Sequence, residues 1–137
     1  MQQATPTRFP TDLDHALSVI DLYFNLKPKY WLYEPVERFE HLGKPYVWNP
    51  DCVFVYQKKV YVCELQRTKL TAKRWAGKWK AYNLYFSRNY FHSAAFQTWS
   101  PKIILPQFLC ISSQSPDIVR NGFSITGRDL IVCREFK

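Results

Sequence analysis

Hydrophobic positions near the start of the chain recur with the period of an α-helix. Thr11 and Asp12 are good N-cap residues, and Pro28 stops the pattern. The apolar positions between them are Leu13, Ala16, Leu17, Ile20 and Phe24. This spacing predicts a first helix over 13–24. The preceding residues, 1–10, contain two prolines and several polar side chains, and they predict a flexible N-terminus before a single domain over 11–137.

Short runs of β-branched and aromatic residues follow this helix. They are Tyr30–Glu34, Val36–Leu42, Asp51–Tyr56 and Val60–Gln66. Gly43-Lys44-Pro45 predicts a turn after the second run, and the polar Gln57-Lys58-Lys59 predicts a hairpin between the last two. Both strands of that hairpin are apolar on both faces, which is typical of central strands in a covered sheet.

The period becomes helical again over 70–86. Trp75, Trp79, Tyr82 and Phe86 form the apolar stripe that would face the core. The next segment, 87–100, has no clear period. The aromatic residues of this segment either pack in the core or form a surface on which bases stack. They are Tyr90, Phe91, Phe96 and Trp99.

The C-terminal part alternates between strand-like and helical patterns. Lys102–Ile111 is apolar and strand-like, although Pro106 argues against an uninterrupted central strand. Ser115–Asn121 predicts a short helix ended by Gly122, and Leu130–Cys133 is a last apolar run. The predicted order gives a mixed α/β domain, with an αβββαβ core and a central mixed sheet flanked by helices.

The charge balance indicates the kind of partner. With 137 residues the chain fits one domain, and 19 Lys and Arg against 11 Asp and Glu give a net charge of +8. Such an excess favours a polyanion, because cations near phosphates release condensed counterions. The chain has no apolar run of ~18 residues, and residues 1–10 lack a signal-peptide pattern. We therefore expect a cytoplasmic protein with DNA as its partner and no membrane association.

The cysteines and histidines do not form a recognisable metal motif. Cys52, Cys63, Cys110 and Cys133 are scattered singly, which predicts buried free thiols rather than a zinc site. His15 and His41 are isolated in the sequence, and we expect them to be structural.

Candidate chemistry lies on the predicted hairpin. A loop of two residues, Lys58-Lys59, or of four, Gln57–Val60, puts Asp51 opposite Gln66 and Val53 opposite Glu64. Asp51, Glu64 and Gln66 then share one face, since side chains alternate along a strand. Two carboxylates at the end of a buried sheet are costly unless they are paired or bind a cation. Asp51 and Glu64 are therefore predicted ligands of a divalent metal, Mg²⁺ or Mn²⁺.

These residues resemble the PD-(D/E)xK, or restriction-endonuclease-like, nuclease superfamily. The resemblance rests on Pro50-Asp51, a strand–turn–strand, Glu64-x-Gln66 and a basic helix after it. Within that superfamily the chain is most similar to the replication-relaxation family of plasmids and mobile elements. The further motifs that carry this similarity are His15-Ala16-Leu17-Ser18-Val19, Trp31 with Glu34, Glu64-Leu65-Gln66-Arg67-Thr68, and Lys78 with Tyr82.

The resemblance implies roles for individual residues. Asp51 and Glu64 would bind the metal, and Glu34 would add a ligand. The superfamily has a lysine two residues after the Glu, where this chain has Gln66. A neutral amide cannot carry that positive charge, although it can orient water. The alternative is that Lys73 or Lys78 reaches into the site from the next helix and takes the place of the lysine.

A run of basic residues without an intervening acid follows Gln66. Its members are Arg67, Lys69, Lys73, Arg74, Lys78 and Lys80. A helix that is merely solvated usually carries opposite charges four residues apart, and none occur here. We predict that these side chains contact the phosphate backbone of DNA.

Two functions follow from the resemblance. The first is a metal-dependent DNA endonuclease or nickase that acts on plasmid or mobile-element DNA. The second is a catalytically inactive nuclease-fold module that binds DNA or a protein in plasmid replication or mobilisation. A salt bridge from Lys73 or Lys78 that fills the site would favour the module. Cleavage of both strands would need two sites, which leaves a homodimer open.

Overall fold

The computed structural model describes residues 9–136, and the chain begins there with a long helix. Helix α1 spans Phe9–Leu26, so Thr11 and Asp12, which we predicted to cap it, lie inside it. The predicted flexible N-terminus, 1–10, lies outside the described residues except for its last two positions, which belong to α1. Within residues 9–136, no helix has both the length and the apolar character needed to cross a membrane.

The centre of the molecule is a mixed sheet of five strands in the order β1-β4-β5-β6-β7. The strands are β1 (Trp31–Tyr33), β4 (Cys52–Tyr56), β5 (Lys59–Gln66), β6 (Gln107–Ser112) and β7 (Leu130–Cys133). β1, β4 and β5 pair antiparallel, and β5, β6 and β7 pair parallel. The mixed α/β class and the central position of β5 are therefore confirmed.

The turn of the β4–β5 hairpin lies one residue earlier in the chain than the predicted two-residue loop. Gln57 and Lys58 alone connect the strands, and both have left-handed φ values, 50° and 66°, as a two-residue turn of type I′ requires. Val53 consequently pairs with Val62, not with Glu64. The predicted register was wrong by two residues. The turn still has an even number of residues, so Asp51, Glu64 and Gln66 keep positions on one face of the sheet, as predicted. Asp51 comes directly before the first strand pair, Cys52 with Cys63, and its position is opposite Glu64.

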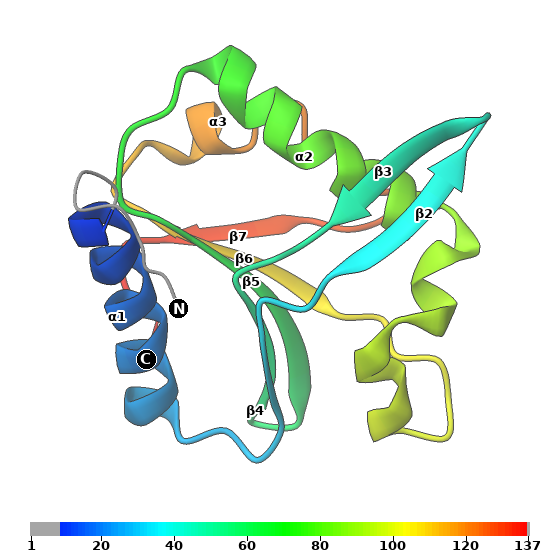
Figure 1. Cartoon of the computed structure of the whole chain (residues 1–137), viewed down its shortest axis with the longest axis horizontal. Coiled ribbons are helices and arrows are strands. Elements are labelled where there is room, and N and C mark those ends of the chain that lie inside the picture. Colours follow the sequence, from blue (N-terminus) through cyan, green and yellow to red (C-terminus); the bar gives the residue numbers. More distant parts are fainter. Residues whose placement is uncertain (1–8, 137) are drawn as a thin grey trace.

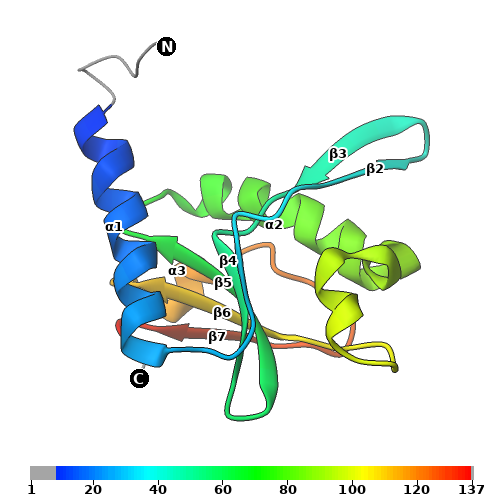
Figure 2. The same ribbon diagram turned by 60° about the horizontal axis from the view of Figure 1, so that its bottom comes forward.

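A second hairpin, β2 (Glu37–His41) with β3 (Lys44–Trp48), projects from the body of the molecule toward α2 (Figures 1 and 2). The predicted turn at Gly43-Lys44-Pro45 is one position too late. Leu42 and Gly43 make the turn with φ values of 53° and 77°. β3 was missed in the sequence because Pro45, inside the strand, and Pro50, two residues after it, obscure its alternation, yet a proline is tolerated in a two-stranded edge.

Each face of the five-stranded sheet is covered by one long helix and has its own core. On one face α1 packs Val19 and Leu22 against β4 and β5. On the other face lies α2 (Ala72–Ser87), which begins where the Thr71 side chain accepts a hydrogen bond from the Arg74 amide. The predicted stripe of α2 is confirmed, since Trp75, Trp79, Tyr82 and Phe86 are all buried.

The aromatic segment that the sequence left unplaced forms two short 3₁₀ helices, η1 (Asn89–Ser93) and η2 (Ala95–Trp99). Phe91 and Phe96 are buried in the core, and the Tyr90 ring packs against Phe39. Core packing therefore accounts for most of this cluster, whereas Trp99 is only partly buried.

The remaining elements match their predictions with shorter bounds. β6 begins only after Pro106, so the predicted strand 102–111 loses its first residues. α3 is a single turn, Pro116–Val119, and Gly122 follows with a φ of 83°. Cys52, Cys63, Cys110 and Cys133 are free thiols, and the first three are buried, as expected.

Candidate functional site

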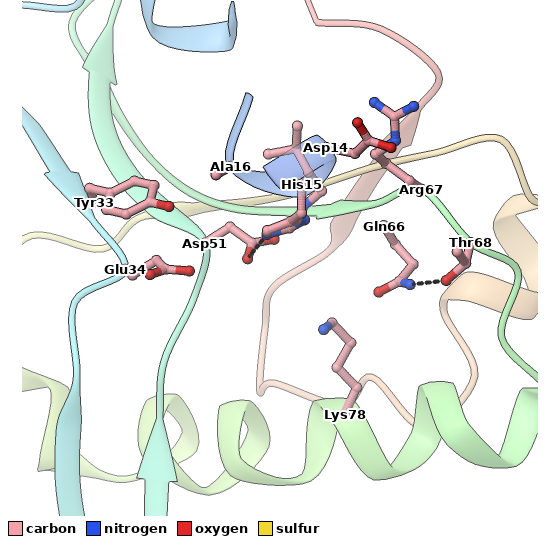
Figure 3. A pocket seen from close by; sticks show the side chains of 11 residues that line it. Asp14, His15, Ala16, Tyr33, Glu34, Asp51, Gln66, Arg67, Thr68 and Lys78 are labelled. Atoms are coloured by element: carbon pink, nitrogen blue, oxygen red, sulfur yellow. Dashed lines mark hydrogen bonds and ion pairs between the residues drawn. The ribbon is translucent and has the colours of Figure 1, made fainter. Parts of the chain in front are cut away.

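A pocket of about 790 Å³ opens at one end of the sheet, between α1 and α2 (Figure 3). Antiparallel pairing brings three chain positions to this end, namely the residue after β1, the residue before β4 and the last residues of β5. These positions hold Glu34, Asp51 and Gln66. Helix α1 adds His15, and α2 adds Lys78. The fold thus brings together side chains that are up to 63 positions apart in the chain (15 to 78).

Asp51 is anchored by both of its carboxylate oxygens. Oδ2 accepts a hydrogen bond from the Leu65 amide at 2.7 Å, and Oδ1 lies 2.8 Å from Nε2 of His15. The side chain is 15% exposed, so it remains open to the pocket. The bond to Leu65 ties the residue before β4 to the end of β5 and fixes the carboxylate in place.

Glu34 is held beside Asp51 by backbone contacts. Its amide donates to the Asp51 carbonyl at 2.9 Å, and the Asn49 side chain donates to the carbonyls of Glu34 and Pro35. Glu34 has a φ of 46°, in the left-handed region that non-glycine residues seldom adopt. Such backbone strain persists only where the surroundings enforce it, and it concentrates at functional sites.

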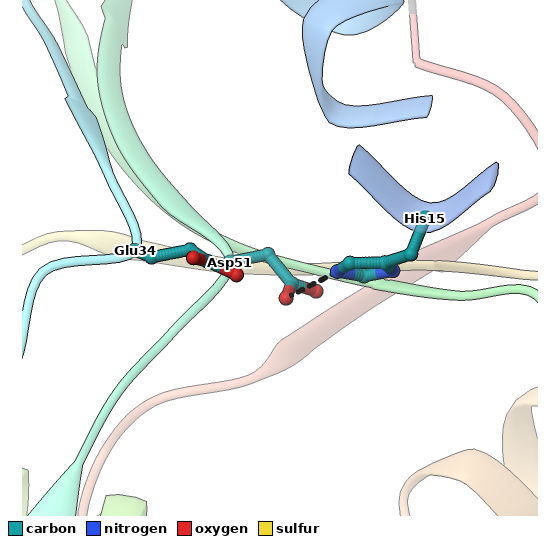
Figure 4. A group of neighbouring side chains, drawn as sticks. All are labelled: His15, Glu34 and Asp51. Atoms are coloured by element: carbon teal, nitrogen blue, oxygen red, sulfur yellow. Dashed lines mark hydrogen bonds and ion pairs between the residues drawn. The ribbon is translucent and has the colours of Figure 1, made fainter. Parts of the chain in front are cut away.

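His15, Glu34 and Asp51 form a cluster of three metal-ligating side chains (Figure 4). One donor atom from each lies within 4.8 Å of the others. The hydrogen bond to Asp51 raises the pKa of His15, although burial opposes this effect. The predicted placement of Glu34 and Asp51 at one site agrees with this geometry.

We predicted a structural role for His15, and its place in the pocket was missed. A signal was present in the helix. His15 precedes the buried Val19 and Leu22 by four and seven residues, so it lies on the face of α1 that packs on the sheet. A polar side chain on such a face needs a polar partner, and here that partner is Asp51.

Glu64 occupies a different environment, although it is next to Leu65. Its side chain is 5% exposed, one oxygen accepts from the Tyr82 hydroxyl, and the other lies 3.1 Å from Nζ of Lys78. Burial and the charge of Asp51 raise the pKa of Glu64 to about 7, against the lowering effect of Lys78 and Tyr82. Glu64 is not in the cluster of His15, Glu34 and Asp51, and its role as a metal ligand stays a prediction.

Lys78 reaches from α2 into the pocket, as the sequence suggested that a lysine of this helix would. Burial lowers its pKa, but the Glu64 carboxylate more than offsets this effect, and the net result is a raised pKa. The lysine therefore carries its positive charge at neutral pH. Lys73 does not line this pocket.

Gln66, which replaces the lysine of the motif, also lines the pocket. Its amide nitrogen donates to the Thr68 hydroxyl at 2.9 Å (Figure 3). This bond leaves the amide oxygen as an acceptor toward the pocket, where it could orient water.

The predicted phosphate-binding residues divide into two groups. Arg67 and Lys78 line the pocket, and Arg67 donates to the Ser18 hydroxyl at 2.6 Å. The other four are exposed outside it, and they are Lys69, Lys73, Arg74 and Lys80. Lys73 and Lys80 are seven residues apart and share the outer face of α2, away from the stripe that packs on the sheet.

Comparison of the chain with known protein families, curated proteins and solved structures gives no match.

Proposed function

We propose that this chain is a metal-dependent DNA endonuclease or nickase of the PD-(D/E)xK type. The observation that carries the proposal is one open pocket with three convergent metal-ligating groups and two cations on its walls. Glu34 and Asp51 are among the residues for which the motif resemblance implied this role, and Lys78 and Arg67 supply positive charge beside them. The natural substrate would be plasmid or mobile-element DNA, as the resemblance implies.

His15, Glu34 and Asp51 would hold the ion. Their donor set fits a divalent metal, because two carboxylate oxygens suit Mg²⁺ or Mn²⁺ and an imidazole nitrogen favours transition ions. The mixed set therefore suits Mn²⁺ better than Mg²⁺. A divalent ion at such a site supplies Lewis acidity and lowers the pKa of bound water.

The protein's own groups would position the substrate. Lys78 and Arg67 carry positive charge toward the pocket, where a scissile phosphate would lie. The amide oxygen of Gln66 would accept a hydrogen bond from the attacking water. Glu64 keeps Lys78 in place through the buried ion pair, and in the motif it is also the second metal ligand.

The test is cleavage of supercoiled plasmid and of single-stranded DNA, with Mn²⁺ or Mg²⁺, by the wild type and by Asp51→Ala. We expect the wild type to cut and Asp51→Ala or added chelator to abolish cutting. The matched control is Asp21→Ala, which removes an exposed carboxylate of α1 outside the pocket and should cut like the wild type. Equal cutting by wild type and Asp51→Ala would refute the proposal.

A specific observation also favours the second candidate, an inactive DNA-binding or interaction module. Lys78 forms an ion pair with Glu64, and Gln66 stands where the motif has lysine. An ion pair satisfies the Glu64 carboxylate without a metal. If the wild type cuts no substrate but binds DNA in a salt-dependent way, the module is the function.

A further inference from the structure

A second groove lies at the other end of the β4–β5 hairpin, beside its turn. It encloses about 380 Å³. Its lining comes from the residue before β1, the hairpin turn, and the segment between η2 and β6. Val55, Val60 and Ile104 give it an aliphatic floor. A groove of this size, with an aliphatic floor and polar groups at its edge, fits a small ligand or a single group of a larger one.

Two stacked aromatic rings form one wall of this groove. Tyr30 and Trp99 have ring centroids 5.5 Å apart and an interplanar angle of 26°. Trp99 packs partly against the core, while Tyr30 is 40% exposed. Nζ of Lys29 lies over the Tyr30 ring, 5.5 Å from its centroid. The Lys29 side chain is exposed, so a flat π system that stacks on the ring can displace it. An exposed ring that is backed by a second ring is a good stacking platform for such a system.

The rim of the groove is positively charged. Lys58 and Lys59 stand exposed at the turn, and the lining contains no Asp or Glu. The two neutral polar residues of the lining are Ser100 and Gln107. Within residues 9–136, no hydrogen bond occupies the Gln107 side-chain amide, which can donate and accept at the same time.

We propose that this groove binds an unpaired nucleotide of a single-stranded nucleic acid. The base would stack on Tyr30, Gln107 or Ser100 would contact its edge, and Lys58 and Lys59 would contact the adjacent phosphates. Cations alone would attract any polyanion. The aromatic wall favours a nucleic acid, and it favours a single strand because the faces of bases in a duplex are already stacked.

The inference deepens the proposed function, on which it rests for the relation between binding and cutting. Tyr30 and Glu34 stand four residues apart at the two ends of β1, roughly 13 Å along the strand. A single strand held in the groove would therefore meet the metal pocket a few nucleotides away. The substrate would be DNA that is unpaired at the site of cleavage.

The experiment measures the binding of a short fluorescent oligothymidylate by anisotropy, in chelator so that nothing is cut. We expect Tyr30→Ala to weaken binding by roughly tenfold, since the base loses the aromatic ring on which it stacks. Tyr30→Phe, which keeps the ring, should bind like the wild type. Lys58→Asn with Lys59→Gln should weaken binding and reduce its salt dependence. Asn tolerates the left-handed φ of 66° at position 58.

Matched controls are Phe24→Ala, which removes another exposed aromatic ring, and Lys44→Gln, which removes an exposed lysine of the β2–β3 hairpin. Both should bind the oligonucleotide like the wild type. Wild-type affinity in Tyr30→Ala, or an equal loss for single strand and duplex, would overturn the inference. The proposed function is tested by cleavage and this inference by binding, so each can fail without the other. If the wild type cuts no DNA but Tyr30→Ala loses binding, the proposed function fails and this inference stands.

Discussion

Asp51 and Glu64 are the two acidic residues of one sequence motif, yet they lie in opposite kinds of environment. Asp51 sits in an open pocket, where its carboxylate accepts the Leu65 amide and forms a hydrogen bond with His15 of α1. Glu64 is buried on the α2 side, where it accepts from Tyr82 and pairs with Lys78. The pKa of Glu64 rises to about 7 chiefly because burial disfavours its charge.

Under the proposed function, this difference separates the binding of the metal by Asp51 from the positioning of Lys78 by Glu64. An accessible carboxylate with an exchangeable partner can accept a metal ion, because the ion replaces a proton or a hydrogen bond. A buried carboxylate with a fixed cation holds that cation in place, and its ionisation depends on the pair remaining intact. The comparison can be tested by changing each side separately.

The largest effect is expected from Lys78→Met, which leaves Glu64 buried without its cation. We expect a loss of about 3 kcal/mol in the free energy of unfolding at pH 8, since removal of one member of a buried pair is strongly destabilising. The loss should shrink at lower pH, where Glu64 takes up a proton. Urea unfolding of both proteins at several pH values measures it. Lys73→Met, on the exposed face of the same helix, should change stability by less than about 0.5 kcal/mol.

The second effect concerns the pH dependence of stability. Because the folded-state pKa of Glu64 is raised to about 7, the folded protein binds this proton more tightly than the unfolded chain. Wild-type stability should therefore fall, relative to Glu64→Gln, as pH rises from about 4.5 to about 7, and the difference should level off above that range.

The expected difference is about 3 kcal/mol at most, and thermal or urea unfolding of both proteins across this range measures it. The hydrogen bond to Asp51, which is the main cause of the raised pKa of His15, is present in both proteins, and the charge of Glu64 adds the smallest contribution to it. A stability difference that stays constant with pH would show that Glu64 is already ionised at the low end of the range.

A third, smaller effect is expected on the open side. His15→Ala should lower Mn²⁺ affinity by roughly tenfold or more but reduce stability by only about 1 kcal/mol, because one partly exposed hydrogen bond is lost. Wild-type affinity should also fall as pH drops below the raised pKa of His15, since the protonated imidazole cannot ligate. Titration calorimetry measures the Mn²⁺ affinity of the variant and the pH dependence of the wild-type affinity, and urea unfolding measures the change in stability. His92→Ala, an exposed histidine of η1, is the control, and an equal loss of Mn²⁺ affinity in it would argue against the cluster.

Periodicity predicted the parts of the fold where one local signal dominates. The stripe of α2 and the apolar strands β4 and β5 are examples, because burial on a fixed face leaves its period in the sequence. β3 was missed, since its only deeply buried residue is Trp48 and Pro45 mimics a turn. The register of β4 and β5 could not be fixed, because the left-handed turn falls on Gln57 and Lys58, which are not typical residues for it.

The sequence predicted the site residues that lie at the ends of paired strands. It did not predict which helix residues complete the site. Asp51 and Gln66 reach one pocket through strand pairing alone. Which lysine of the basic run enters depends on how α2 crosses the sheet, and only packing decides that Lys78 does and Lys73 does not. His15 joins the site by the same kind of tertiary contact.

The smallest effect tests whether the strained backbone of Glu34 belongs to the open site. Glu34→Gly removes the Cβ from a residue with a φ of 46°, and relief of left-handed strain should raise stability by about 0.5–1 kcal/mol. The same change removes a carboxylate, so Mn²⁺ affinity should fall by roughly tenfold. Gln57→Gly is the matched control, because its φ of 50° lies in the hairpin turn away from this pocket. It should give the same gain in stability and leave Mn²⁺ affinity unchanged. If Glu34→Gly binds Mn²⁺ as tightly as Gln57→Gly does, the strain at Glu34 serves the loop and not the metal site.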